Sequence, residues 1–292
     1  MVILLDKFIT TEGGYINDLQ MKRWIVIALI AFLSFDSSAA TVDTVSIYST
    51  AMNKAFNCVV IKPGRYKKEK KGFPVVYLLH GYSGNYSNWI TLVPALKKYA
   101  DAFNLLIVCP DGGHSSWYFD SPVDSSMRYE TYVGLEVPHF IDNHYKTIKH
   151  RNARAITGLS MGGHGGLFLG LRHSDRFGAC GSMSGGVELF SSRKKFDLMK
   201  RLGDTITHAE NWKTYSVMNL MEKRATDSLA IIIDCGTEDF FFTINRELHE
   251  KMLRLNIAHD YIERPGKHDW NYWANAVKYQ LLYFRTYFDK MN

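Results

Sequence analysis

The feature that most constrains the fold is a serine in the sequence GLSMG, residues 158–162. An apolar run at residues 155–158 leads directly into it, and a glycine-rich segment with helical character, residues 161–171, follows. This order predicts a strand, a sharp turn and a helix, which would expose the side chain of Ser160 at the helix N-terminus. The free N–H groups there favour developing negative charge, so Ser160 is a candidate nucleophile. The alternative is that Ser160 only caps a tightly packed glycine-rich helix.

Short apolar runs alternate with helical patterns along the rest of the chain. Continuous apolar runs of this length, ended by Gly, Pro or Asp, are typical of buried parallel strands. They cover residues 75–79, 105–109, 155–158, 178–183, 229–235 and 260–263, after a predicted antiparallel pair at 44–49 and 56–61. Helical stripes occur at residues 129–145, at 242–255 and from Trp270 onward. We therefore predict an α/β fold with a mostly parallel central sheet, helices on both faces and a small helical insertion within residues 187–228.

A serine hydroxyl is a weak nucleophile without a base, and that base needs a carboxylate to orient it. In a fold with this strand–turn–helix element, the acid and the histidine follow the serine in the chain, each on a loop after a strand. Asp239 lies just after one predicted strand, and His268 lies between the last predicted strand and the last helix. We therefore predict a triad of Ser160, His268 and Asp239. Glu238 is the competing acid, whereas Asp234 lies inside its strand and is interpreted as structural.

A second loop is expected to complete the site. The predicted strand 75–79 ends in His80-Gly81, and the backbone N–H of Tyr82 in the following loop is a candidate oxyanion donor. The N–H of Met161, directly after the serine, is the second predicted donor. His80 itself is interpreted as a residue that stabilises the loop.

The N-terminal region has the pattern of an export signal. Within residues 21–40, two basic residues precede an apolar run at 24–35, and small residues at 38–40 offer a cleavage site. The apolar run is too short to span a bilayer, so we expect a cleaved signal and a secreted or periplasmic protein without a stable membrane anchor. Residues 1–20 resemble no targeting element, and a start at residue 21 is the alternative. The predicted mature domain covers residues 41–292.

Charge and cysteine content exclude several other classes. The formal net charge is +6, and the basic clusters adjoin polar, turn-like stretches, so they are interpreted as solvated faces rather than a nucleic-acid site. Four cysteines in 292 residues do not make a disulfide scaffold. No CxxC pair or His/Cys cluster indicates a metal, and no cofactor is predicted.

Several motifs together resemble the esterase D-like branch of the α/β hydrolases. They are LLHG at residues 78–81, DGG at 111–113, WYFDSP at 117–122, GLSMGG at 158–163, CGTED at 235–239 and HDW at 268–270. This branch includes feruloyl and acetylxylan esterases (carbohydrate esterase family one), tributyrin-type esterases, S-formylglutathione hydrolases and mycolyltransferases. The resemblance spans about residues 55–288 and implies an α/β-hydrolase fold, a serine carboxylic ester hydrolase, and the same triad and oxyanion donors. Tyr82 is a departure, because small residues usually follow His-Gly in this loop.

The resemblance and the predicted export favour a carbohydrate-linked acyl ester, feruloyl or acetyl, with an aromatic acyl group preferred over a long fatty chain. Export argues against an S-formylglutathione hydrolase. Four aromatic side chains near the predicted site could bind a flat acyl group or a sugar ring: Trp89, Trp117, Tyr118 and Trp212. The alternative is that they only pack in the core. Trp270 and Trp273 lie on the apolar stripe of the last helix and are interpreted as core. The alternatives are an acyltransferase, a short-chain tributyrin-type esterase, and a non-catalytic binding protein on a hydrolase scaffold.

Overall fold

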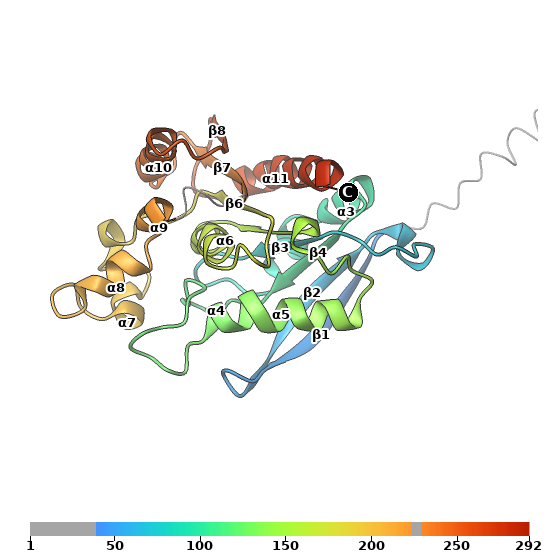
Figure 1. The fold of residues 1–292 in the computed structure, drawn as a ribbon, viewed down its shortest axis with the longest axis horizontal. Helices are drawn as coiled ribbons and strands as arrows, with labels where there is room; N and C mark the ends of the chain where they lie inside the picture. Colours follow the sequence, from blue (N-terminus) through green and yellow to red (C-terminus); the bar gives the residue numbers. More distant parts are fainter. Residues whose placement is uncertain (1–38, 224–228, 292) are drawn as a thin grey trace, which may run out of the picture. The chain divides into compact units, whose positions relative to one another are not determined.

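The computed structural model describes residues 39–223 and 229–291. The signal expected at residues 21–40 lies almost wholly outside them and stays a prediction. The strands are β1 (Thr41–Ser49), β2 (Lys54–Lys62), β3 (Val75–Leu79), β4 (Leu106–Pro110), β5 (Arg154–Gly158), β6 (Ala179–Met183), β7 (Ala230–Gly236) and β8 (Asp260–Arg264) (Figure 1). The helices are α2 (Asn88–Leu92), α3 (Leu96–Phe103), α4 (Tyr129–Thr131), α5 (Val137–His144), α6 (Met161–Arg172), α7 (Leu198–Leu202), α8 (Ala209–Thr214), α9 (Val217–Lys223), α10 (Phe242–Arg254) and α11 (Trp270–Met291). Short helical turns are η1 (Gly64–Lys67), η2 (Tyr132–Glu136), η3 (Arg151–Ala153) and η4 (Phe190–Ser192).

The strands form one eight-stranded sheet in the order β1-β2-β4-β3-β5-β6-β7-β8. β1 pairs with β2 and β2 with β4 in antiparallel register, and every later pairing is parallel. The predicted antiparallel pair and the mostly parallel sheet are therefore confirmed. β5 lies between β3 and β6, so the turn that follows it lies at the carboxyl edge of the sheet beside the ends of its neighbours. This is where α/β sheets bind their ligands.

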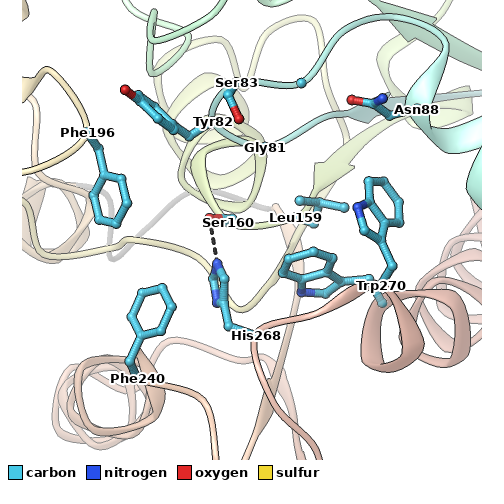
Figure 2. Close-up of a pocket in the computed structure, with 12 residues that line it drawn as sticks. Gly81, Tyr82, Ser83, Asn88, Leu159, Ser160, Phe196, Phe240, His268 and Trp270 are labelled. Carbon is cyan, nitrogen blue, oxygen red and sulfur yellow. Dashed lines mark hydrogen bonds between the residues drawn. The ribbon is translucent and has the colours of Figure 1, made fainter.

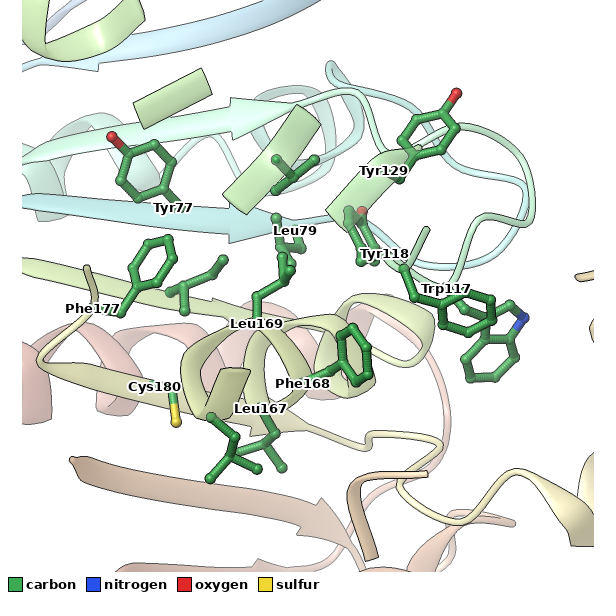
Figure 3. Packing of buried hydrophobic residues seen from close by; sticks show 14 of the residues in the cluster. Tyr77, Leu79, Trp117, Tyr118, Tyr129, Leu167, Phe168, Leu169, Phe177 and Cys180 are labelled. Atoms are coloured by element: carbon green, nitrogen blue, oxygen red, sulfur yellow. The ribbon is translucent and has the colours of Figure 1, made fainter. Parts of the chain in front are cut away.

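Alternate residues of the strands supply two separate cores, one on each face of the sheet. On β3, Tyr77 packs in a cluster with side chains of α5, α6 and α10, while Leu78 packs in a second cluster with side chains of α3 and α11. Figure 3 shows part of the first cluster, with Tyr77 beside Phe177 and Leu79 near Leu169 of α6. Helices therefore cover both faces, which is why β3 and β4 are buried and apolar at every position.

The glycines of α6 let this helix lie unusually close to the sheet. A Cβ atom on Gly166 would lie 2.4 Å from the backbone oxygen of Gly181 in β6 and 2.9 Å from the Cα of Thr157 in β5. No side chain fits in that space, so the helix that begins at Ser160 is held against the two strands at the centre of the sheet. The glycine-rich sequence thus fixes the position of the turn that carries the serine.

The predicted helical insertion is present in the described part of residues 187–228. It contains η4, α7, α8 and α9, of which the three α-helices are drawn close together in Figure 1. The four cysteines are all buried and free, which agrees with the absence of a disulfide scaffold. Within residues 39–223 and 229–291, no helix has the length and apolar character needed to cross a membrane.

Candidate active site

Ser160 lies on a strained turn between β5 and α6. Its backbone has φ 54° and ψ −115°, a conformation that costs a non-glycine residue about 1–3 kcal/mol. Its N–H donates to the backbone oxygen of Met183 at 2.9 Å, and the N–H of Leu159 donates to Leu79 at 3.3 Å, so the adjacent strands hold the turn from both sides. A Cβ on Gly162 would lie 2.5 Å from the backbone oxygen of His80, which explains the glycine after the serine. The predicted strand–turn–helix arrangement is confirmed.

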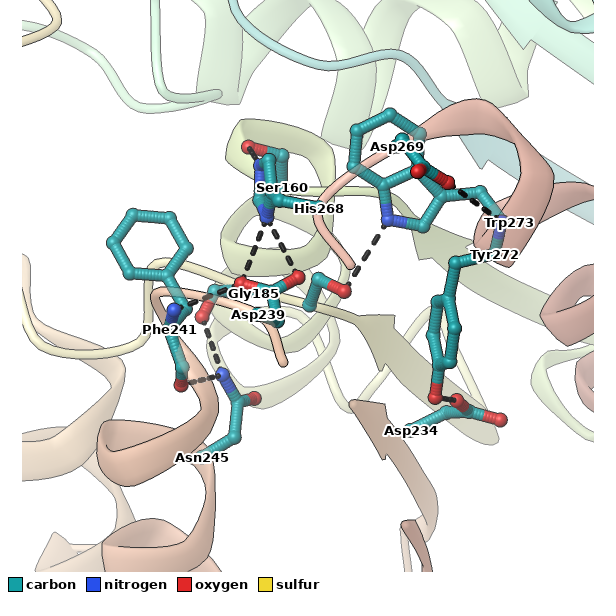
Figure 4. Close-up of polar contacts among 11 residues, drawn as sticks. Ser160, Gly185, Asp234, Asp239, Phe241, Asn245, His268, Asp269, Tyr272 and Trp273 are labelled. Carbon is teal, nitrogen blue, oxygen red and sulfur yellow. Dashed lines mark hydrogen bonds and ion pairs between the residues drawn. The ribbon is translucent and has the colours of Figure 1, made fainter. Parts of the chain in front are cut away.

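The loops after β7 and β8 bring Asp239 and His268 to this turn. His268 Nε2 lies 2.9 Å from Ser160 Oγ, and His268 Nδ1 lies 2.8 Å from Asp239 Oδ2 and 3.0 Å from Oδ1 (Figure 4). A carboxylate can only accept, so Nδ1 carries the proton and Nε2 accepts the hydrogen bond from the serine hydroxyl. The three residues predicted from the sequence therefore form one continuous chain of hydrogen bonds.

The surroundings of the carboxylates separate Asp239 from its competitors. The Asp239 side chain is fully buried, and its Oδ1 accepts a hydrogen bond from the N–H of Phe241 at 2.8 Å. Glu238 is 56% exposed, and its carboxylate lies 3.8 Å from Lys267 Nζ. It therefore has no part in the hydrogen-bond chain.

Asp234 is held inside the core by Tyr272 and Arg264. Burial raises the pKa of its carboxyl to about 6, although both partners oppose that shift. Its place in the strand and its two partners agree with the structural role predicted for it.

The loop after β3 carries two features of an oxyanion site. His80 is buried, with Nδ1 donating to the backbone oxygen of Gly81 at 2.8 Å and Nε2 accepting from the N–H of Gly112 at 2.7 Å. Burial lowers the pKa of the His80 imidazole, which therefore stays neutral and stabilises the loop as predicted. In the part of the chain that the structure describes, neither the N–H of Tyr82 nor that of Met161 has an acceptor. Both amides are therefore available to a ligand.

A cleft of about 520 Å³ opens over Ser160 and His268 (Figure 2). Its aromatic lining is Tyr82, Phe196, Phe240, Trp270 and Trp273. Its polar lining away from the hydrogen-bond chain is Ser83 and Asn88. In Figure 2, Phe196 and Phe240 lie on one side of Ser160, and Asn88 and Trp270 lie on the other. The cleft therefore has an aromatic side and a mixed polar side, with the serine between them.

The four aromatic residues predicted to bind substrate are not in the cleft. Trp89, Trp117, Tyr118 and Trp212 are each at most 3% exposed, so that prediction is wrong. Their polar atoms are occupied inside the protein: the indole N–H groups of Trp89, Trp117 and Trp212 donate to the backbone oxygens of Leu79, Phe196 and Gly203, respectively, and the Tyr118 hydroxyl donates to that of His80. A buried indole or phenol needs such an acceptor, and here all four acceptors are backbone oxygens. These side chains are therefore part of the cores.

The interpretation of Trp270 and Trp273 as core residues that do not reach the site is also wrong in part. Both line the cleft, although Trp273 is nearly buried and its N–H donates to Ser184 Oγ at 3.3 Å. The first turn of α11 follows His268 directly, so its apolar stripe meets the cleft before it meets the core. Phe196 and Phe240 were not predicted at all. The position of Phe240 directly after Asp239 is a signal that could have found it, whereas nothing in the sequence around Phe196 indicates a place in the site.

No metal site accompanies this arrangement in residues 39–223 and 229–291, where no three His, Cys, Asp or Glu side chains are grouped to hold an ion. The polar groups at the site are a serine hydroxyl, an imidazole, a buried carboxylate and two free amides, which together suit acyl transfer.

Sequence comparisons identify a family. A family model described as putative esterase matches residues 49–284. An acetyl esterase of Caldicellulosiruptor saccharolyticus is 25% identical over 258 residues, which are 80% of this chain and 96% of the relative. An esterase of Mycobacterium tuberculosis is 27% identical over 239 residues, 72% of this chain but 51% of the relative. A diacylglycerol acyltransferase/mycolyltransferase of Mycobacterium avium is 34% identical over 39% of this chain and 36% of its own length.

Structural comparisons agree with the family. A ferulic acid esterase superposes with a TM-score of 0.73 at 29% identity, covering 85% of this chain and 99% of the other. An S-formylglutathione hydrolase of Staphylococcus aureus superposes with a TM-score of 0.75 at 22% identity over 85% of this chain and all of the other, which shows a shared fold. With the family match extending over most of the sheet and both catalytic loops, the chain belongs to the putative esterase family and is a serine esterase of α/β-hydrolase fold.

Proposed function

We propose that Ser160 is the nucleophile, His268 the general base and Asp239 the residue that orients it, in ester hydrolysis through an acyl-enzyme. The observation that carries this proposal is the hydrogen-bond chain from Ser160 Oγ through His268 to Asp239, at 2.9 and 2.8 Å, which begins at the floor of an open cleft. The N–H groups of Tyr82 and Met161 are the proposed oxyanion donors.

The reaction follows from these positions. Ser160 Oγ attacks the ester carbonyl while its proton passes to His268 Nε2, and the carbonyl oxygen becomes an oxyanion held by the two amides. One such donor contributes about 3–4 kcal/mol to transition-state stabilisation. His268 then gives the proton to the departing alcohol oxygen, which leaves the acyl group on Ser160. Water attacks this ester in the same way, with His268 again taking the proton, and releases the acid.

Covalent labelling tests the nucleophile directly. A fluorophosphonate probe should label the wild type once, and Ser160→Ala should abolish both labelling and esterase activity without lowering Tm. Ser191→Ala is the matched control, because Ser191 is an exposed serine of the insertion. Labelling of Ser160→Ala at the wild-type rate would refute the assignment. An unlabelled, inactive wild type would favour the non-catalytic binding protein.

Acyl transfer is the second candidate activity, since the same acyl-enzyme can react with an alcohol in place of water. The relative named diacylglycerol acyltransferase/mycolyltransferase, which is similar over 39% of this chain, is the reason to consider acyl transfer. Adding a sugar alcohol to the assay and measuring the ratio of acylated sugar to free acid separates the two. A product that is mainly free acid at millimolar acceptor supports hydrolysis.

For the substrate, we propose an acyl ester, feruloyl or acetyl, whose alcohol is a carbohydrate. Two relatives are named acetyl esterase and ferulic acid esterase. The polar side of the cleft supports a sugar alcohol, because Trp270, which packs at right angles to Trp89 at 5.2 Å, lines the cleft together with Asn88. Aromatic faces beside amide groups suit the mixed polar and apolar surface of a sugar ring.

Two esters of one acid test the carbohydrate part. The kcat/KM for feruloylated arabinose should exceed that for methyl ferulate by about tenfold, which is 1.4 kcal/mol of transition-state preference. Trp270→Ala should lower kcat/KM for the sugar ester to the value for the methyl ester and leave kcat/KM for the methyl ester unchanged. Equal kcat/KM values for the two esters in the wild type would reject a carbohydrate alcohol and favour a short-chain esterase.

We also propose export to the periplasm or the medium, on the strength of the basic, apolar and small-residue pattern within residues 21–40. N-terminal sequencing of exported protein should begin near Thr41. Recovery of the intact N-terminus on cytoplasmic protein would overturn this proposal and reopen the cytosolic thioester alternative.

A further inference from the structure

Two phenylalanines on one side of Ser160 present apolar surface to the cleft. Phe240 is 62% exposed, and its ring centre lies 4.2 Å from that of His268. Phe196 is half-buried, and its ring lies 6.5 Å from that of Phe240 with only 16° between the two planes. Figure 2 shows both rings on the same side of Ser160. They form the aromatic wall of the cleft, and an apolar surface of this kind gains stability when a ligand covers it.

The wall is fixed in place before any ligand binds. Phe240 packs edge-on against Phe241 at 4.5 Å, and the N–H of Phe241 is bound to the buried Asp239. The backbone at Phe196 has φ 55°, a left-handed conformation that disfavours a bulky residue, and its oxygen accepts a hydrogen bond from the Trp117 indole at 3.0 Å. The buried Trp117 therefore stabilises the strained position that presents Phe196 to the cleft.

The next residue ties the wall to the oxyanion loop. Asp197 also has a left-handed backbone, with φ 56°, and its carboxylate accepts from the Tyr82 hydroxyl at 3.3 Å and binds Lys200 at 2.9 Å. The polar atom of Tyr82 is thus directed to Asp197 and not to a ligand. Since all these contacts are made within the protein, the wall does not have to be ordered on binding, which favours affinity.

The chemistry of the two sides of the cleft assigns the two parts of the ester. Asn88 and Ser83 are polar and suit a hydroxyl-rich alcohol, whereas the wall offers ring faces and edges. We infer that Phe196 and Phe240 are specificity-determining residues that bind a planar aryl group on the acyl side of the substrate. This inference rests on the proposed ester hydrolysis and narrows its acyl group. An acetyl group would leave the rings uncovered, and a saturated chain would lose the ring–ring contacts.

A pair of esters isolates the aromatic contribution. Methyl 3-phenylpropanoate and methyl 3-cyclohexylpropanoate have the same carbon skeleton and similar carbonyl reactivity, and they differ in whether the ring is flat and aromatic. The wild type should prefer the phenyl ester in kcat/KM by about tenfold, as expected for aromatic contacts with two rings. Phe240→Ala and Phe196→Ala should each erase most of that preference, and each should lower kcat/KM for the phenyl ester about tenfold more than kcat/KM for methyl acetate.

Phe190→Ala is the matched control, because Phe190 is a phenylalanine of the same insertion that is 48% exposed and lies outside the cleft lining. It should behave as wild type on all esters. Phenyl acetate carries its ring on the alcohol and should be insensitive to the wall variants.

Three results would overturn the inference. If the two wall variants lost as much kcat/KM on methyl acetate as on the phenyl ester, the rings would only support His268. Loss on phenyl acetate, with the phenylpropanoate unaffected, would mean that the wall binds the alcohol. A wild type that hydrolyses the phenyl and cyclohexyl esters equally would show that the wall selects no aryl group. A wild type that hydrolyses none of the four esters would instead reject the proposed function, and the role of the wall with it.

Discussion

Replacing Asp239 by Asn should nearly abolish catalysis while leaving the fold intact, and the local contacts explain why. Asp239 Oδ1 accepts from the N–H of Phe241, and Oδ2 faces His268 Nδ1 at 2.8 Å. An asparagine would keep its oxygen on the Phe241 amide and place its NH₂ group against Nδ1. His268 would then have to accept at Nδ1 and carry its proton on Nε2, where it can no longer take the proton of Ser160.

The expected loss is large because it combines the wrong tautomer with an uncompensated imidazolium. We expect kcat to fall about 10⁴-fold, or about 5 kcal/mol in activation free energy. The assay is steady-state hydrolysis of a simple ester, with Tm measured by circular dichroism to verify folding. The matched control is Glu238→Gln, which changes the exposed neighbouring acid and should keep kcat within twofold. Near-normal activity in Asp239→Asn, with loss in Glu238→Gln, would refute this reasoning.

Three further predictions concern the scaffold. Gly162→Ala should cost about 3 kcal/mol of stability and most activity, because its Cβ would lie 2.5 and 2.6 Å from the backbone oxygens of His80 and Leu79; a wild-type Tm would contradict this. Burial lowers the pKa of His164 from 6.5 to about 4, so the unfolded chain binds a proton more readily than the folded protein. The resulting contribution to the free energy of unfolding, up to about 3 kcal/mol, is fully present above pH 6.5 and is lost as the pH falls to 4. Urea unfolding at several pH values should show a weaker pH dependence in His164→Gln than in the wild type, and identical slopes would refute the assignment. The native protein should leave a thiol reagent unconsumed, and all four thiols should react after unfolding; a rapid native reaction would contradict the burial of Cys58, Cys109, Cys180 and Cys235.

Most of the fold could be predicted because the sheet is mostly parallel and its central strands are buried on both faces. Such strands are rich in apolar residues, and residues such as Pro110, Gly158 and Gly236 mark their ends in the sequence as they do in the structure. The triad was predictable for a related reason. Each of its members follows a recognisable strand, and parallel strands bring their carboxyl ends to one edge of the sheet.

The lining of the cleft was not predictable in the same way. An apolar pattern shows that a tryptophan is half-buried on a helix, but not whether its free face meets the core or a cleft. Trp270, on the first turn of α11, meets the cleft, whereas Trp89 is enclosed and binds a backbone oxygen. Phe196 depends on two consecutive left-handed residues, and neither Phe nor Asp at those positions signals that conformation in the sequence as a glycine would.

The order of the strands along the chain also has a consequence for biosynthesis. The oxyanion loop and Ser160 belong to the part of the chain that is made first, and they can fold once β3, β5 and β6 have paired. Asp239 and His268 arrive only with β7 and β8, which extend one edge of the sheet. Without β7 and β8, the chain has the Ser160 hydroxyl but neither the carboxylate nor the imidazole that would activate it. We therefore expect a chain that ends before these strands to have no activity toward esters.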